Sequence, residues 1–556
     1  MIDCPLTPST ISMIRWFMWC SKNYTCSIDG YLYMNFAGVC DCCIRDIGLE
    51  LLMKGMDLES YRIIMEAYQN DYPFYKKTVD HKAFPAIWKT LISHIVRNLL
   101  YYIFTFPSVE RVIQDTEAIF EKVDKRAEAL QKYVLEAGEN VSMTHIMNGH
   151  HDVYTAIYKE SLSLNIYTLM STRRITSILE KYGLTESEIQ SLWCFNANSI
   201  ATRWSQASSK AASALLAVFK DNASLSEEFE SICAAKDNDR AISFLNSIRN
   251  DASSASQSFI DAWDAFLAEF GHRANVEFDL ASPRYQERPV DLLILIHRID
   301  PTNTKSIEQN LRERDEATEA ILSKLTWYDR WVVQRNLPYA RVFPTYREWS
   351  KQGFIRITTE FRRALLLIGQ KCVKRGLLEQ VDDVFYLEME DIMAWEANEE
   401  RGAEFKSLVA KRRAVYNASP LHPHARMIIA PECIMLDASN ELKEELKNVP
   451  ENVLVGVPTC SGVVEGEVVL VTDPDTELPP GAILVARATE PSWTPLFMNA
   501  AAVILEIGGP LTHGSVIARE LCIPCVVGVK ELMKRLKTGM RVQVDGTKGL
   551  VTIVKE

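Results

Sequence analysis

The sequence predicts an α+β protein of several domains, with a large, mainly helical domain followed by a small domain of mixed strands and helices. At 556 residues the chain exceeds what one hydrophobic core usually serves. Apolar residues recur every three to four positions from about residue 45 to about residue 415, which is the helical period. Beyond residue 450, short β-branched runs alternate with Gly, Pro and Asp turns. The predicted domains are residues 1–416, a hinge at 417–450, and residues 451–556.

The helical region contains three long amphipathic runs, and its breaks are expected at prolines. One short strand is conceivable at Asp383–Leu387. The most apolar stretch, 91–106, includes charged residues and is shorter than the roughly 20 residues that a bilayer span needs, so we expect a buried helix and no membrane contact. The helical runs are 110–137, 207–219 and 358–376, and the breaks are Pro107, Pro283, Pro289 and Pro338.

The amino-acid composition of the chain changes at about residue 417 and again at about residue 450. Residues 417–450 combine Asn, Ser and three prolines with a charged run at 441–447, a composition typical of a linker. After it, β-branched residues predict short strands between turns. The predicted strands are 466–472, 482–486, 502–505, 526–529 and 541–544.

Composition excludes several classes of function. The balance of 47% hydrophobic and 24% charged residues is typical of an ordered globular protein. A net charge of -12 argues against a nucleic-acid partner, because such binding depends on clustered Lys and Arg. No secretory signal pattern opens the sequence, so the 13 cysteines are expected to be reduced thiols in the cytoplasm. Cys40, Cys42 and Cys43 lack the paired spacing of zinc sites, so no protein-bound metal is predicted.

One segment, residues 508–520, has the pattern of a reactive loop. Two glycines let the backbone turn tightly, and the run beginning at His513 is helical in pattern. The N-terminus of such a helix directs free N–H groups and a positive dipole end at a group beside the imidazole, which favours a phosphoryl group. A histidine with a pKa near 6.5 is largely neutral at physiological pH and can attack phosphorus. The alternative is a histidine that only caps a helix or fills a loop.

Residues 508–528, together with 488–496 upstream, closely resemble the phosphohistidine domain of the phosphoenolpyruvate-utilising enzymes. The nearest branch is that of rifampicin phosphotransferase, with phosphoenolpyruvate synthase and pyruvate phosphate dikinase more distant. The resemblance implies a C-terminal swivelling β/β/α domain. It also implies that His513 accepts the β-phosphate of ATP and passes it on. Leu511 replaces a threonine of the dikinases and agrees with the rifampicin phosphotransferase type.

Several neighbours of His513 are candidates for holding a phosphoryl group. Thr512 is a candidate catalytic residue that can hydrogen-bond a phosphoryl oxygen, although threonine is also an ordinary helix N-cap. Arg519 lies six residues on, about 240° around a regular helix, so a surface salt bridge is its alternative role. The phosphate-binding candidates are Gly509, Gly514, Ser515 and Arg519.

A second, weaker resemblance covers residues 270–289 and 382–387, which resemble parts of the substrate domain of rifampicin phosphotransferase. This segment gives four candidate substrate-pocket residues, of which one is a possible general base for an acceptor hydroxyl. The alternative is a buried ion network that holds the domain together. The candidates are His272, the possible base, and Arg273, Glu277 and Arg284.

Complete members of this family carry an ATP-grasp domain before the helical domain, and the segment Pro5–Pro8 resembles the join where the helical domain begins. No phosphate-binding Gly-x-x-x-x-Gly-Lys-Ser/Thr motif is present in the chain. We therefore expect a separate ATP-grasp partner that supplies the phosphoryl group. ATP, bound by that partner, and Mg²⁺ are the expected cofactors.

The predicted function is a dikinase-type phosphotransferase in secondary metabolism or detoxification. Phospho-His513 would receive the phosphoryl group from the ATP-grasp partner and deliver it to a hydroxyl-bearing small molecule, with residues 417–450 as the hinge. Two alternatives stay open. One is an ATP-dependent condensation or dehydration enzyme of the prodigiosin-synthesising type, and the other is a catalytically idle binding protein.

Overall fold

The computed structural model describes residues 7–8, 13, 25–28, 31–34, 108–149, 167–168, 170–184, 188–189, 192, 199–220, 222–299, 307–418, 427–429, 434–436, 449–472, 476–489, 493–509 and 512–555. The predicted helix at 91–106 and the cysteines Cys40, Cys42 and Cys43 lie outside these residues. No helix within the described residues combines the length and hydropathy that crossing a membrane requires.

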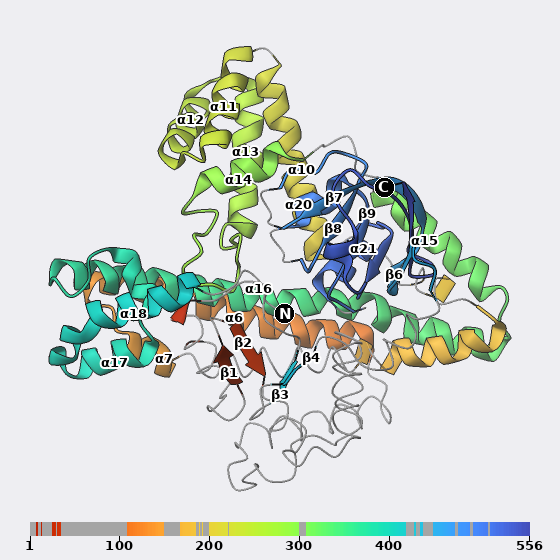
Figure 1. Cartoon of the computed structure of the whole chain (residues 1–556), viewed down its shortest axis with the longest axis horizontal. Coiled ribbons are helices and arrows are strands. Elements are labelled where there is room, and N and C mark those ends of the chain that lie inside the picture. Colours follow the sequence, from red (N-terminus) through yellow and green to blue (C-terminus); the bar gives the residue numbers. More distant parts are fainter. Residues whose placement is uncertain are drawn as a thin grey trace, which may run out of the picture.

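Two long helices form the spine of the helical region. The helix α16, Trp327–Lys374, runs the length of the region, and α6, Val109–Ala137, packs along it (Figure 1). A bundle of α10 to α14 stands on one side of this spine, and α7, α17 and α18 lie at the end opposite α15. The bundle helices are α10 Ile200–Phe219, α11 Ala223–Ala235, α12 Asn238–Asn250, α13 Ser254–Phe270 and α14 Pro289–His297. The others are α7 Met143–Gly149, α15 Ile307–Leu322, α17 Met389–Ala397 and α18 Phe405–Ala418, with short 3-10 turns η3 Gly138–Asn140, η4 Glu180–Tyr182, η5 Val381–Tyr386 and η6 Glu399–Glu404.

The three predicted helical runs are confirmed by α6, α10 and α16. Pro289 occupies the first turn of α14, where its missing N–H costs nothing. The break predicted at Pro338 is wrong, because α16 continues through it. The backbone hydrogen bond that proline cannot make is offset by the burial of its neighbours Leu337 and Tyr339, which expose 6% and 2% of their surfaces.

The possible strand at Asp383–Leu387 is also wrong, because these residues belong to η5 and the residue that ends it. The Asp383 carboxylate accepts hydrogen bonds from the backbone N–H groups of Glu379 and Gln380 at 3.1 and 3.0 Å. Such a side-chain bond favours a turn over an extended chain. The apolar alternation in the sequence reflects Val384 and Phe385, which are buried against α16 in the core of the spine.

Two short hairpins occur in segments that were not predicted to contain strands. The strands β1, Thr25–Ile28, and β2, Tyr31–Met34, pair antiparallel within the predicted helical domain. The strands β3, Met427–Ile429, and β4, Ile434–Leu436, pair antiparallel inside the predicted hinge.

The C-terminal domain is built on one eight-stranded sheet with the order β5-β12-β11-β7-β8-β9-β10-β6. The strands β7 to β10 are parallel to one another, and the remaining pairs are antiparallel. The five predicted strands are confirmed, and three more complete the sheet: β12 pairs with β11, and β5 and β6 form the two edges. The strands are β5 Val453–Val455, β6 Val457–Cys460, β7 Val463–Val471, β8 Ala482–Ala486, β9 Ala500–Leu505, β10 Cys525–Val527, β11 Arg541–Asp545 and β12 Leu550–Lys555; the helices are α20 Thr494–Asn499, α21 His513–Glu520 and α22 Leu532–Arg535.

The C-terminal domain contacts the helical region through α20 and α21, which both lie against α10 (Figure 1). The side chain of Met498 is buried in the core of the α10–α14 bundle, and the Ser205 hydroxyl donates to its sulfur at 3.5 Å. The Asn499 amide donates to the carbonyl oxygen of Arg298 at 2.6 Å. We call these two interactions the docking contact.

Candidate active site

The candidate site lies where two parallel strands end. Strands β8 and β9 are paired in parallel, so the segments that follow them leave the same edge of the sheet. Thr489 follows β8, and the loop that leads to His513 follows β9. In open α/β sheets ligands bind in the crevice at this edge. His513 is the first residue of α21, as the sequence predicts, and Thr512 occupies the N-cap position with φ −75° and ψ 161°.

Side-chain hydroxyls close the loop before α21. The carbonyl oxygen of Gly509 accepts hydrogen bonds from the Thr512 hydroxyl at 2.8 Å, from the Ser515 hydroxyl at 2.8 Å, and from the Thr512 N–H at 3.0 Å. The Thr512 hydroxyl therefore does not cap the helix. The Thr512 side chain therefore does not compete with an anion for the backbone donors and the dipole at the N-terminus of α21.

Two glycines are required by close contacts in this loop. Gly508 has φ 153°, and a Cβ there would lie 3.0 Å from the Thr512 hydroxyl oxygen. A Cβ on Gly514 would lie 2.4 Å from Leu505 Cδ1 and 2.7 Å from the Thr489 hydroxyl oxygen. The start of α21 can therefore approach β9 and Thr489 only if residue 514 has no side chain.

Thr489 is a candidate that the sequence reasoning did not single out. Its hydroxyl oxygen is buried and has no hydrogen-bond partner among the described residues. A buried hydroxyl without a partner is costly, which indicates a ligand that satisfies it. The available signal was its position after a fully buried strand of the same sheet, next to the strand that precedes His513.

Both ring nitrogens of His513 are shielded from solvent, since each exposes less than 1 Å², while the residue as a whole is partly exposed. Its helix contacts α10 of the helical region. Arg519 lies at the other end of α21, about 9 Å along the axis from His513 at 1.5 Å per residue. The structure thus brings Gly509, Thr512, Gly514 and Ser515 around His513 and leaves Arg519 apart.

The four candidate substrate-pocket residues lie together in a different place, against α16. Arg273 pairs with Glu277, and the Lys351 ammonium lies 2.9 Å from the same carboxylate. Arg284 is fully buried and donates to the carbonyl oxygen of Glu277 at 3.1 Å. His272 is buried, and its backbone carbonyl accepts from the Thr359 hydroxyl at 3.1 Å.

Burial sets the electrostatics of this cluster. Burial alone would raise the pKa of Glu277, but the charges of Arg273 and Lys351 outweigh it and lower that pKa to about 2. Burial, followed by the charge of Arg362, lowers the pKa of Arg284 to about 10. Burial, followed by the charges of Arg356 and Arg273, holds the pKa of the His272 ring well below 6.5. The cluster can thus hold a neutral imidazole beside fixed charges.

Within the described residues, no group of three or more His, Cys, Asp or Glu side chains converges to hold a metal ion.

The comparisons with known proteins match two regions of the chain. Residues 478–549 match the family described as PEP-utilising enzyme, mobile domain, and this range contains β8, β9 and α21. Residues 189–348 match the rifampicin phosphotransferase fourth domain.

Curated relatives agree with these matches. The chain is 32% identical over 305 residues to rifampicin phosphotransferase of Bacillus cereus and 31% identical over 308 residues to that of Bacillus subtilis, in each case over 53% of this chain and 34% of the relative. It is 30% identical over 300 residues to the prodigiosin synthesizing transferase PigC of Serratia marcescens, over 52% of this chain and 33% of the relative. The chain thus spans about one third of the length of these relatives.

A solved structure, the holo form of Thermococcus kodakaraensis aconitase X, aligns with 19% of this chain and 100% of its own at 28% identity, but with a TM-score of 0.16. That score is too low to bear on the fold. The family resemblance predicted from residues 508–528 is confirmed by the other matches. The chain is similar to rifampicin phosphotransferase over about half of its length. Within it, residues 478–549 carry the sequence pattern of the PEP-utilising mobile domain.

Proposed function

We propose that this chain is the carrier and acceptor-binding part of a phosphotransferase that works through a phosphohistidine at His513. The observation that carries the proposal is the position of His513. It begins a helix whose N-cap residue, Thr512, makes no side-chain capping bond, at the carboxyl ends of parallel strands and inside the segment that matches the mobile domain. Backbone donors at such a terminus favour the oxygens of a phosphoryl group.

Each step of the proposed transfer exchanges one bond to phosphorus. In the first step, a ring nitrogen of neutral His513 attacks the β-phosphorus of ATP, a P–N bond forms, and the P–O bond to AMP breaks, so the β- and γ-phosphates are on the ring. Water then takes up the γ-phosphate as inorganic phosphate, the P–O bond between the two phosphates breaks, and one phosphoryl group stays on His513. In the second step, the oxygen of an acceptor hydroxyl attacks, the P–N bond breaks, and a base takes the hydroxyl proton. The buried hydroxyl of Thr489 and the N–H groups of α21 are proposed to hold the phosphoryl oxygens.

The first step needs a loading module, which we propose is an ATP-grasp protein that binds ATP with Mg²⁺. Because the ring nitrogens of His513 are shielded while the docking contact is made, the C-terminal domain must move away from α10 to be loaded. Residues 417–450 are the proposed hinge. The docked arrangement is then the one in which the phosphoryl group faces the helical region.

We propose that the acceptor is a hydroxyl-bearing small molecule held by the helical region. The match of residues 189–348 to the rifampicin phosphotransferase fourth domain supports this, because the relatives' name denotes transfer to a small molecule. Of the four candidate pocket residues, His272 is the proposed base. Its Nε2 atom is buried without a hydrogen-bond partner among the described residues, and its lowered pKa keeps the ring neutral and able to accept a proton.

The test is acid-labile labelling of the chain. Wild type, His513→Gln and His297→Gln are each incubated with β-³²P-labelled ATP, Mg²⁺ and an ATP-grasp protein whose own ATP hydrolysis is verified. His297 lies on the surface of α14 and is the matched control. Wild type and His297→Gln should take up label that acid removes, and His513→Gln should take up none. Equal labelling of all three chains, or none with an active loading protein, contradicts the proposal.

A second candidate function is favoured by the similarity to the prodigiosin synthesizing transferase PigC. In this case the phosphoryl group activates a substrate for condensation, and no phosphorylated product leaves the enzyme. Phosphorus NMR of the reaction mixture separates the two functions. A new phosphoester signal supports the phosphotransferase, and release of inorganic phosphate together with a joined product supports the condensing enzyme.

A further inference from the structure

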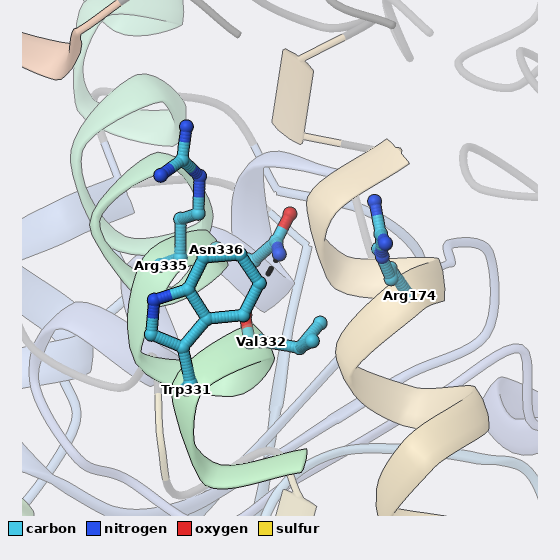
Figure 2. Close-up of a pocket in the computed structure, with 5 residues that line it drawn as sticks. All are labelled: Arg174, Trp331, Val332, Arg335 and Asn336. Atoms are coloured by element: carbon cyan, nitrogen blue, oxygen red, sulfur yellow. Dashed lines mark hydrogen bonds between the residues drawn. The ribbon is translucent and has the colours of Figure 1, made fainter. Parts of the chain in front are cut away.

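A cavity of about 230 Å³ lies near the start of α16, apart from the cluster around Glu277. Figure 2 shows that it has two walls, with Arg174 on one helix and the other four lining residues on α16. Arg174 belongs to the helical residues 170–179. The cavity is lined by Arg174, Trp331, Val332, Arg335 and Asn336.

On α16, Trp331 presents an aromatic ring to the cavity, and Val332 and Asn336 form its base. Trp331 is 52% exposed, and the Arg335 guanidinium lies 5.5 Å from the centroid of its ring. Below them, Val332 is part of a small hydrophobic core, and the buried Asn336 amide donates to the Val332 carbonyl at 2.8 Å. The base is therefore fixed, while the indole ring remains accessible to a planar ligand.

The charge of the cavity is opposite to that of the chain. The described residues that line it include two arginines and no carboxylate, although the chain carries a net charge of -12. Arg174 is exposed and has no ion pair or hydrogen bond among the described residues. A guanidinium in this position can form paired hydrogen bonds with a carboxylate or a phosphate.

We propose that this cavity binds a small planar aromatic anion. The ring of the ligand stacks on Trp331, and its carboxylate or phosphate forms paired hydrogen bonds with the guanidinium of Arg174. The volume is below the 300–1,000 Å³ of typical drug-sized sites, which restricts the ligand to about one or two fused rings. This inference is independent of phosphoryl transfer, because it uses none of the residues around His513.

The surface next to the cavity supplies an internal control. Trp327 is 81% exposed and makes an edge-to-face contact with Tyr328, with ring centroids 5.8 Å apart. Trp327 does not line the cavity. A ligand that merely adheres to exposed aromatic rings would use Trp327 as well as Trp331. A ligand bound in the cavity uses Trp331 alone.

The first experiment is calorimetric titration of the whole chain with 2-naphthoate, and in parallel with neutral 2-naphthamide and with cyclohexanecarboxylate. The probe that has both a planar ring and a charge should bind at least about tenfold more tightly than either of the others, which is a difference of about 1.4 kcal/mol. Equal affinity for naphthoate and naphthamide, or no heat of binding for naphthoate up to its solubility limit, overturns the proposal.

The second experiment compares variants at matched positions. Trp331→Leu and Arg174→Gln should each weaken naphthoate binding by about tenfold, because each removes one of the two recognition elements. Trp327→Leu and His513→Gln should stay within about twofold of wild type. If Trp327→Leu weakens binding as much as Trp331→Leu, the ligand sits on the aromatic surface and the cavity assignment fails. Thermal unfolding of each variant verifies that the fold is retained.

Discussion

The Ser515 hydroxyl donates a 2.8 Å hydrogen bond to the carbonyl oxygen of Gly509, six residues earlier, across the start of α21. The Thr512 hydroxyl donates to the same oxygen. Both hydroxyls, which the sequence offers as phosphate ligands, are therefore committed to holding the loop closed. The donors that remain for an anion at this terminus are backbone N–H groups, so the loop geometry determines whether His513 can carry a phosphoryl group.

Ser515→Ala should lower the free energy of unfolding by about 1–2 kcal/mol, because Ser515 is fully buried and Gly509 loses one of its three donors. It should also slow labelling of His513. Urea unfolding and the initial rate of acid-labile labelling measure the two effects. Ser243→Ala is the control, since Ser243 makes a similar 3.0 Å bond to a backbone carbonyl but is exposed. Equal behaviour of the two variants would show that the loop does not depend on Ser515.

Gly514→Ala should disturb the site sterically. The new methyl group would lie 2.4 Å from Leu505 Cδ1 and 2.7 Å from the Thr489 hydroxyl oxygen, so these side chains or α21 must move. Overpacking of this kind costs about 1–3 kcal/mol. The control is Gly149→Ala, where nothing lies within 4 Å of the added Cβ. Thermal unfolding and labelling of His513 should both be impaired in Gly514→Ala and unchanged in Gly149→Ala; an unimpaired Gly514→Ala would argue that α21 tolerates the shift.

Local patterns in the sequence account for much of this site. The strand at 482–486 and the start of α21 at His513 were predicted with their observed bounds, because a run of buried apolar residues and a glycine loop before a helix are local signals. The roles of Thr512 and Ser515 could not be predicted, because they depend on where the Gly509 carbonyl points. Thr489 was not singled out, since only the parallel pairing of β8 and β9 brings it beside Gly514.

Other parts of the fold depend on tertiary contacts that override local preference. The break predicted at Pro338 did not occur, because packing on both sides holds α16 together. The short edge strands β5 and β6 have weak patterns of their own and are fixed by their pairing partners in the sheet. The buried cluster around Glu277 was predicted to be either an ion network or a substrate pocket. Its ion pairs, from Arg273 and from Lys351 to Glu277, are those of an ion network.

Glu277→Gln tests how that cluster stabilises the fold. The pKa of Glu277 falls from 4.5 to about 2 on folding, so its contribution is fully present above pH 4.5 and is lost as the pH falls towards 2. A shift of this size corresponds to about 3 kcal/mol. The variant should be less stable than wild type by roughly this amount at pH 7, and the difference should shrink at pH 3. Urea unfolding at both pH values measures it.

The matched control for that experiment is Glu121→Gln, which breaks an exposed ion pair with Lys125. Exposed pairs of this kind contribute little, so its unfolding curve should coincide with that of wild type at pH 7. A difference between Glu277→Gln and wild type that is the same at pH 7 and pH 3 would mean that the lost stability comes from packing and not from the ionised carboxylate.

Met498→Lys should release the C-terminal domain from the helical region. The Met498 side chain is 6% exposed, lies in the core of the α10–α14 bundle and accepts a hydrogen bond from Ser205. An ammonium group there would lose its hydration inside a hydrophobic core, so the docked arrangement becomes unfavourable by several kcal/mol. The shielded ring of His513 should then become accessible.

The measurement is the rate at which diethyl pyrocarbonate modifies His513, followed by mass spectrometry of its peptide. The reagent needs a free ring nitrogen, and both nitrogens are covered in the docked arrangement. We expect a rate at least about fivefold higher in Met498→Lys, since a few kcal/mol shifts a two-state equilibrium by that factor or more. Val554→Lys, on an exposed position of β12, is the control and should react like wild type. If Met498→Lys also reacts like wild type, the docking contact does not control access to His513, and the shielding must arise within the C-terminal domain itself.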